Sequence, residues 1–410
     1  MRVLFISLTS LESFEQEGIY SDLLREFISN SHDVTAITPD SQLNKNFKKI
    51  RSLDNEIIKI KVPQVSGIQS KILKGINTIL FPHILWRQMI KTIDVKEFDL
   101  VIYPTPPISI EKIIKKIKKK NKNIHTFLLL KDIFPQNAVD LKYFAENSLV
   151  HKYFRKQEIR LYKLSDSIGC MSPANKDYLI EHNSFLAKRK VSLVPNSISN
   201  HRINSKLNIE KKNKRKEKMG LPSNKKIIAY AGNLGKPQSI DFLIKNLENI
   251  DTNNSNVHFV FCGDGTEFMK LKKYCDSNSD LCSFFGKMSK QDSDALIAIS
   301  DYGLILLDSR FTIPNYPSRM LSYMKFGLPL IAFTDSNTDI KDYIQEKNIG
   351  IWRESCDLNL SEVIPFIENI DNKTYNIFSN NASECLKNDF NTMDGYCTIL
   401  NSFISRKGSE

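Results

Sequence analysis

Cysteine is scarce in this sequence, and the seven cysteines that occur form no regular pattern. Their number is odd, and no Cys-x-x-Cys is present. Disulfide-stapled domains carry an even, regularly spaced set, and cysteine zinc sites need paired ligands. The pattern therefore argues against both, and it favours a protein of a reducing compartment.

Long apolar runs are also absent. The longest apolar stretch, residues 76–86, is interrupted by Asn77, Thr78 and His83 and is too short to span a bilayer. The apolar residues 2–7 are followed by several glutamates, which is typical of a first buried strand rather than of a signal peptide. We therefore expect a cytoplasmic protein.

Glycine and proline each occur only 15 times, so clusters of either residue carry information. The remaining composition, 41% hydrophobic and 25% charged, is that of a globular protein. A chain of 410 residues is long for one core and fits two domains.

The net charge of +12 is unevenly distributed. Residues 1–200 hold 31 lysines and arginines against 20 acids, residues 201–218 hold eight against two, and residues 219–410 hold 19 against 24. The basic first half predicts an anionic partner. The charge alone leaves open whether that partner is nucleic acid, a membrane surface or a phosphorylated substrate.

Short apolar runs alternate with helical patterns in both halves. Continuous runs of β-branched and apolar residues are typical of parallel strands that are covered on both faces. The expected strands are 3–7, 33–38, 99–103, 125–130 and 167–171 in the first half, and 226–231, 257–262, 281–285, 303–307 and 328–333 in the second. Helical segments between them predict βαβ units and an α/β fold of two doubly wound, Rossmann-like domains facing across a cleft.

The same patterns predict the domain boundaries. We expect domains at 1–200 and 222–375, with a basic linker at 201–221. A C-terminal helical segment at 376–410 can pack back on the first domain. Ligands of such sheets bind outside the carboxyl ends of the strands.

A glycine-containing loop follows the expected strand 226–231. Gly232, Asn233, Gly235 and Lys236 form a turn whose backbone amides can approach phosphate oxygens closely. An ordinary strand-to-helix turn is the competing interpretation. The absence of a Gly-x-Gly-x-x-Gly pattern argues against a nicotinamide-dependent enzyme.

A second anion-binding signal is the start of a short helix. Tyr316 and Pro317 precede Ser318, an expected N-cap, and Arg319 and Met320 follow. A helix start offers free N–H groups to an anion, and Arg319 can add a bidentate contact to a phosphate. A well-capped surface helix is the alternative.

Two further turns follow expected strands. Gly263 and Gly265 form a tight turn that we interpret as structural. Gly286, Lys287 and Met288 end another strand, where the backbone could contact a base edge.

These motifs, in this order, resemble the family 4 glycosyltransferases, which have the two-domain GT-B fold. The segments that carry the resemblance are Val194-Pro-Asn-Ser197, Ala231-Gly-Asn-Leu-Gly235, Cys262-Gly-Asp-Gly265, Phe285-Gly-Lys287, Pro317-Ser-Arg319 and Phe326-Gly-Leu-Pro-Leu-Ile-Ala332. The segments 130–135 and 315–319 look like the branch that adds N-acetylfucosamine-type sugars to surface polysaccharide precursors. The resemblance implies a UDP-sugar donor bound by residues 222–375 and an acceptor bound by the first domain.

The sequence departs from the family's pattern at several places. The family's basic residues in the first loop are replaced by Asn233 and Gln238, and we expect Lys236 to substitute for them. The family's paired glutamates would fall at Pro314 and Ser322, so both carboxylates are missing.

Glycosyl transfer expels a nucleoside diphosphate, whose negative charge must be stabilised. The only Asp-x-Asp, Asp292-Ser-Asp294, opens an expected helix, where acidic residues suit the helix dipole. We therefore predict no metal and no cofactor. Lys236, Arg319 and the amides near Gly235 and Ser318 are expected to neutralise the diphosphate.

Acceptor-side residues are expected in the first domain. Asp132 follows an apolar strand and can act as a base toward the acceptor hydroxyl, although capping the next segment is the alternative. Lys131 precedes it and can pair with it or with phosphate. Glu17, Gly18 and Tyr20 resemble the family's acceptor-side loop, and a plain helix start is equally compatible.

Two basic segments predict contact with an anionic membrane surface. Isoleucines at helical spacing between 110 and 117 are surrounded by lysines at 112–122, and residues 68–93 combine apolar and basic side chains. Buried core is the competing interpretation of both. We expect a peripheral enzyme at the inner face of the membrane that meets a lipid-diphosphate-linked glycan.

Three other functions compete with this one. A sugar-nucleotide epimerase of the same fold needs the same diphosphate loops but no acceptor. A degenerate transferase acting as a scaffold fits the missing glutamates. We expect no nucleic-acid binding, because no aromatic-interleaved basic motif is present.

Overall fold

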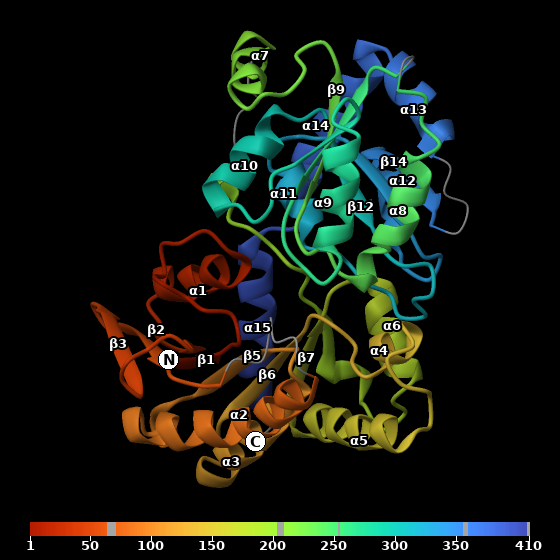
Figure 1. Ribbon diagram of the computed structural model, residues 1–410. Helices are drawn as coiled ribbons and strands as arrows, with labels where there is room; N and C mark the ends of the chain where they lie inside the picture. The colour runs from red at the N-terminus through yellow and green to blue at the C-terminus, as the bar shows by residue number, and fades with distance from the viewer. Residues whose placement is uncertain (64–70, 203–208, 253–254, 356–359, 408–410) are drawn as a thin grey trace. The chain divides into compact units, whose positions relative to one another are not determined.

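The computed structural model describes residues 1–63, 71–202, 209–252, 255–355 and 360–407 (Figure 1). The chain divides into two compact units. Unit 1 comprises Met1–Ser199 and Thr392–Glu410, and unit 2 comprises Asn200–Asn391. Two features differ from the expected boundaries: the basic segment 201–221 belongs to unit 2, and the C-terminal segment is divided between the units at residue 392.

Unit 1 contains one eight-stranded sheet in the order β3-β4-β2-β1-β5-β6-β7-β8. All pairs are parallel except β3 and β4. The strands are β1 (Arg2–Ile6), β2 (Asp33–Pro39), β3 (Phe47–Ser52), β4 (Asn55–Ile60), β5 (Leu100–Pro104), β6 (His125–Leu130), β7 (Ser167–Cys170) and β8 (Val191–Leu193). Four central strands are almost wholly buried, which explains why continuous apolar runs predicted them.

Helices cover both faces of this sheet. They are α1 (Ile19–Ser29), α2 (Lys71–Thr92), α3 (Glu111–Lys120), α4 (Gln136–Asp140), α5 (Leu149–Leu164), α6 (Pro173–Glu181) and α15 (Thr392–Lys407). Contacts join α2 to α3 and α3 to α5 on one side, and α1 to α15 on the other (Figure 1). The C-terminal helix α15 thus completes unit 1, where Tyr396 bonds the His32 ring at 3.1 Å.

Unit 2 contains a six-stranded, fully parallel sheet in the order β11-β10-β9-β12-β13-β14. The strands are β9 (Lys226–Ala231), β10 (Val257–Cys262), β11 (Cys282–Phe284), β12 (Tyr302–Leu306), β13 (Leu330–Thr334) and β14 (Gly350–Glu354). The strand order reverses between β9 and β12, and in unit 1 it reverses between β1 and β5. Such reversals mark where ligands bind in doubly wound sheets.

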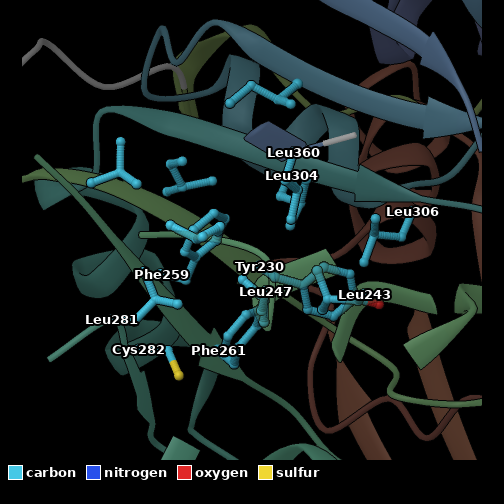
Figure 2. Packing of buried hydrophobic residues seen from close by; sticks show 14 of the residues in the cluster. Tyr230, Leu243, Leu247, Phe259, Phe261, Leu281, Cys282, Leu304, Leu306 and Leu360 are labelled. Carbon is cyan, nitrogen blue, oxygen red and sulfur yellow. The ribbon is translucent and has the colours of Figure 1, made fainter. Parts of the chain in front are cut away.

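The core of unit 2 lies between this sheet and its helices. The helices are α7 (Ile209–Lys218), α8 (Ile240–Leu247), α9 (Phe268–Ser277), α10 (Lys290–Ile299), α11 (Arg319–Met324), α12 (Ile340–Lys347), α13 (Leu360–Asn369) and α14 (Asn372–Asp389). Figure 2 shows Leu243 and Leu247 of α8 among Tyr230, Phe259 and Phe261 of the sheet.

The basic run at 209–218 forms the helix α7. Lys212 and Lys216 bind the carboxylate of Asp301, at 2.6 and 3.3 Å. Asp301 also accepts the Ile227 N–H at 2.7 Å. The segment predicted as a linker is therefore held to unit 2 at the beginning of β9.

Helices α2 and α3 contain the two segments that were predicted to contact a membrane, and both are partly buried. In α2, Phe81, Leu85 and Met89 are buried in unit 1, whereas Leu80 and Ile90 are exposed. In α3 the isoleucines at 113, 114 and 117 are buried. Residues 68–70 lie outside the described residues. Among the described residues, no helix is both long enough and apolar enough to cross a membrane.

Candidate active site

The carboxyl ends of β9 and β12 lie side by side in unit 2, where the strand order reverses. The loop 232–235 follows β9, and residues 307–311 follow β12. The Asp308 N–H donates to the Pro237 carbonyl at 2.9 Å, which ties the two loops together. Because both loops leave the same edge of the sheet, this edge is the candidate donor site.

Arg319 lies against the first of these loops. Its guanidinium stacks on the Tyr230 ring, with the carbon Cζ 4.4 Å from the ring centroid. A Cβ placed on Gly232, whose φ is +142°, would lie 3.5 Å from Arg319 Cζ. The Nη1 of Arg319 is buried and has no hydrogen-bond partner among the described residues. A buried cation with an unsatisfied donor is costly, so this nitrogen is set to receive an anion.

Tyr230 and Tyr323 contact Arg319 or the two strands at the candidate donor site. The sequence analysis did not identify either of them. The Tyr323 hydroxyl donates to the Leu304 carbonyl and accepts the Ala231 N–H, both at 3.0 Å. It therefore ties β9 to β12 at the point of reversal. Gly303 leaves room for this ring, since a Cβ there would lie 2.2 Å from Tyr323.

The amides of the glycine loop are engaged within the protein. The N–H groups of Gly232 and Leu234 donate to the carbonyls of Cys262 and Asp264, at 3.0 and 2.9 Å. The Gly235 N–H donates to Gln238 Oε1 at 3.1 Å. The phosphate-binding role predicted for the Gly235 amide would therefore need that bond to be exchanged.

Gln238 stands at the position where the family resemblance predicts a lysine, and its side chain bonds to the glycine loop. Besides the Gly235 amide, its Oε1 accepts from Asn233 Nδ2 at 2.9 Å. Lys236 is exposed beside it. Gln238 thus holds the shape of the loop through these two bonds, and the role predicted for Lys236 stays a prediction.

The turn at Gly263 is structural, as its two glycines predicted. A Cβ on Gly263 would lie 1.8 Å from the Gly232 carbonyl oxygen, and one on Gly265 would lie 2.3 Å from that of Leu234. The loops after β9 and β10 thus pack backbone to backbone. Gly286, with φ +66°, accepts the Gly263 N–H at 2.8 Å, beside an exposed Lys287 and a half-buried Met288.

The start of α11 differs from its prediction. Ser318 has helical backbone angles and makes no side-chain capping bond, and α11 is only six residues long. Tyr316 and Met320 are buried, and the Tyr316 ring contacts Tyr343 and Phe390. The side chains of Tyr316 and Met320 pack inside unit 2. Only the backbone of these two residues could therefore contact a nucleotide.

The Asp-x-Asp segment opens α10, as predicted. The Ser289 side chain accepts the Asp292 N–H at 3.1 Å and so caps the helix. Asp294 pairs with Lys290 and, at 2.7 Å, with the buried Lys325. The Asp292 carboxylate in turn accepts the Ser289 hydroxyl at 2.6 Å, so both carboxylates have a structural role at the helix start.

Asp132 lies just beyond the carboxyl end of β6 in unit 1. Its Oδ2 accepts a hydrogen bond from Asn137 Nδ2 at 2.6 Å. Burial raises the pKa of Asp132 to about 6, against the lowering effect of hydrogen bonds from Ile133 and Asn137. A carboxyl group that titrates near neutrality can exchange a proton with a bound hydroxyl.

Lys131 precedes Asp132 and is engaged by the backbone. Its Nζ donates to the Val194 carbonyl at 3.3 Å. Burial lowers the pKa of Lys131 to about 7, so its charge also changes near neutral pH.

The other acceptor-side residues lie at the start of α1. Gly18 is the N-cap residue, with extended backbone, and Glu17 beside it is exposed. The Tyr20 ring packs against Phe5 with centroids 5.3 Å apart, and burial raises the pKa of its hydroxyl. Tyr20 is therefore part of the core of unit 1. The functional roles of Glu17, Gly18 and Tyr20 stay predictions.

Comparisons with known proteins show what this chain is similar to. Residues 211–384 match the family model "Glycosyl transferases group 1". A relative from Pseudomonas aeruginosa, described as probable glycosyltransferase WbjE, is 23% identical over 265 residues. The alignment covers 58% of this chain and 61% of the relative, so the chain spans less than two thirds of its length.

Solved structures share the fold of the whole chain. Sucrose-phosphate synthase from Thermosynechococcus elongatus matches with a TM-score of 0.74 and 12% identity, over 100% of both chains. Anabaena HepE, solved with UDP and glucose, matches with a TM-score of 0.67 and 14% identity, over 99% of this chain and 100% of its own. The predicted α/β fold with mostly parallel sheets is confirmed, and its structural neighbours are glycosyltransferases of the GT-B fold. Residues 211–384, in unit 2, are similar to the glycosyl transferases group 1 family.

Proposed function

We propose that this chain is a metal-independent glycosyltransferase that uses a UDP-sugar as donor. The observation that carries the proposal is the buried, unpartnered Nη1 of Arg319 beside Gly232, at the reversal point of the unit 2 sheet. A diphosphate is an anion of the kind that this guanidinium can bind. HepE, which shares the fold, was solved with UDP, and this supports UDP as the nucleotide.

In this scheme Arg319 and the exposed Lys236 stabilise the diphosphate as the bond to the sugar breaks. Tyr230 and Tyr323 keep the Arg319 side chain and the adjoining strands in place, so little reorganisation is needed when charge develops. Preorganised donors of this kind lower the barrier more than flexible ones do. The scheme has no step that needs a divalent cation.

Asp132 supplies the base on the acceptor side. With a pKa of about 6 it is mostly ionised at neutral pH, and it can accept the proton of the attacking hydroxyl. Asn137 orients the carboxylate through its hydrogen bond to Oδ2.

The finer assignment concerns the sugar, the acceptor and the location. We propose an N-acetylated hexosamine or deoxyhexosamine as the sugar and a lipid-linked glycan of bacterial surface polysaccharide (capsule or O-antigen) as the acceptor. The segments 130–135 and 315–319 support this choice. A lipid-linked acceptor implies a peripheral enzyme at the inner face of the cell membrane.

The test is UDP binding by the Arg319→Gln variant, measured by isothermal titration calorimetry. Losing a charged hydrogen bond should weaken UDP binding by about tenfold to a hundredfold. Arg353→Gln is the matched control, because Arg353 is exposed on β14 and bonds a carbonyl of its own strand. Equal affinity in wild type and Arg319→Gln would remove the basis of the proposal.

Turnover distinguishes the remaining alternatives. A panel of UDP-sugars is incubated with and without a short lipid-linked glycan, in buffer with EDTA. Transfer to the glycan in EDTA is expected. Conversion of the donor in the absence of acceptor would indicate an epimerase instead, and UDP binding without any turnover would indicate a scaffold.

A further inference from the structure

Helix α5, which belongs to unit 1 (Figure 1), carries a row of exposed cations. Lys152, Lys156, Arg160 and Lys163 follow one another at intervals of three or four residues, so they share one side of the helix. Within the described residues none of the four forms an ion pair with an acid. A groove along the helix is lined by these residues together with Arg155 and Ile159.

Two acids near this row are turned inward, whereas Glu146, which precedes α5, is exposed. Glu158, the one acidic residue of α5, is buried and bound by Arg155 and by the Tyr162 hydroxyl. Glu111, whose charge acts on Arg160, is buried on α3. The outward side of α5 is therefore strongly positive.

Exposed apolar side chains adjoin the same row at its N-terminal end. Leu149 is 87% exposed, and Val150, Tyr153 and Tyr143 are about half exposed. Leu149 and Tyr153 lie on the side of α5 that carries the cations, since Leu149 precedes Lys152 by three residues and Tyr153 precedes Lys156 by three. A large exposed aliphatic side chain in such a place indicates an interaction surface.

Aromatic rings support this end of the helix from below. The Phe134 and Phe154 rings are 5.0 Å apart, and Phe144 stacks on Phe154 at 6.2 Å. At the other end, Lys163 lies 5.0 Å over the ring of Phe185, which is 40% exposed. Apolar groups therefore flank the cations at both ends.

We propose that this side of α5 (Leu149, Lys152, Tyr153, Lys156, Arg160 and Lys163) is a docking surface for an anionic lipid bilayer. The cations contact lipid phosphates, and Leu149 and Tyr153 enter the region between headgroups and acyl chains. The inference deepens the proposed function and rests on its lipid-linked acceptor.

The α5 surface fits a bilayer better than the lysine-rich helix α3 does. The isoleucines of α3 are buried, Lys118 is paired with Asp166 at 2.8 Å, and Lys116 lies over the Trp86 ring. The exposed lysines of α3 therefore have charge without an exposed apolar side chain on the same helix. Interfacial binding needs both.

The experiment compares two sets of charge removals in the full-length protein. Binding to phosphatidylcholine vesicles with and without phosphatidylglycerol is measured by co-sedimentation. The α5 variant is K152Q/K156Q/R160Q/K163Q, and the matched control is K115Q/K119Q/K120Q/K122Q, which removes as many exposed charges at and just beyond the end of α3. Each headgroup-bound cation contributes about 1 kcal/mol, so the α5 variant should lose up to about a thousandfold in affinity for the anionic vesicles.

A second variant, L149S/Y153S, tests insertion. It should weaken vesicle binding by tenfold or more, and the loss should persist at high salt, where charge attraction is screened. Unchanged vesicle binding in both α5 variants, or an equal loss in the α3 control, would overturn the inference. Equally tight binding of a single-stranded oligonucleotide by wild type, lost in the α5 variant, would show that the surface is a nucleic-acid site instead.

UDP affinity separates this inference from the proposed function. The α5 variants should bind UDP as wild type does, because the donor residues lie in unit 2. Vesicle binding without UDP binding would refute the proposed function and leave the α5 surface standing. UDP binding and turnover on a detergent-solubilised acceptor, without vesicle binding, would refute the α5 docking surface and leave the proposed function intact.

Discussion

The titration of Asp132 allows a quantitative test of its role as the base. The carboxylate is held by one side-chain hydrogen bond, from Asn137 at 2.6 Å, and this bond stabilises the ionised form. A hydrogen bond to a charged group contributes about 1.5–3 kcal/mol, and a pKa unit corresponds to about 1.4 kcal/mol. Removing the amide in Asn137→Ala should therefore raise the pKa of Asp132 by about one to two units.

The assay is the pH dependence of kcat/KM, which reports groups of the free enzyme. The base must be ionised, so activity should fall as the pH drops through about 6 in wild type and through about 7 to 8 in Asn137→Ala. Gln136→Ala is the control, because Gln136 bonds Asp140 from the same short helix. An acid limb at the same pH in all three proteins would refute the assignment of Asp132.

The free energy of unfolding provides a second test of the pKa of Asp132. A carboxyl whose pKa is raised by folding stabilises the protein below its unfolded pKa, and this stability is lost as the pH rises through about 6. Asp132→Asn stays neutral at every pH. Because the side chain is only partly buried, we expect the substitution to increase the free energy of unfolding at pH 8 by about 1–2 kcal/mol while abolishing transfer. A urea titration at pH 8 and at pH 4 measures the difference, which should vanish at the lower pH.

The remaining predictions concern Tyr323 and Gly263, which lie at the candidate donor site. Tyr323→Phe removes two buried hydrogen bonds between β9 and β12 and should lower the free energy of unfolding by about 1–3 kcal/mol, as measured in urea; a smaller loss would mean that water replaces the hydroxyl. Gly263→Ala places a Cβ against the Gly232 carbonyl and should cost at least about 2 kcal/mol and weaken UDP binding, whereas Gly220→Ala, with positive φ but open space, should cost less and leave UDP binding unchanged. Equal UDP affinity in Gly263→Ala and wild type would show that the two loops do not shape the donor site.

Local signals were sufficient for most of the buried strands, although β4, which is largely buried, was not predicted. Strands such as β6 and β10 are apolar at nearly every position, and this pattern by itself predicts a strand covered on both faces. The glycines at 263 and 265 predicted a tight turn, and Asp292 with Asp294 predicted a helix start. In each case neighbouring residues contain the physical cause.

Elements whose residues are polar or half-buried were missed. The edge strand β3 is mostly exposed, and β14 has no buried residue, so neither shows the apolar run of a central strand. Ser318 was expected to cap α11, but the backbone at this position is already helical and its side chain makes no cap. The basic run at 211–218 was expected to be solvated, yet Asp301 pairs with two of its lysines.

The sequence by itself determined most of the strands, the glycine turns, the basic first half and the residue types available for anion binding. Only the tertiary structure decided which of these residues meet. Arg319 comes to lie on Tyr230 because β9 and β12 are neighbours in the sheet and α11 follows β12. The burial of Asp132 and of Lys131 likewise depends on segments far away in the chain, because desolvation reflects all the atoms that surround a charge and not the residues beside it in sequence.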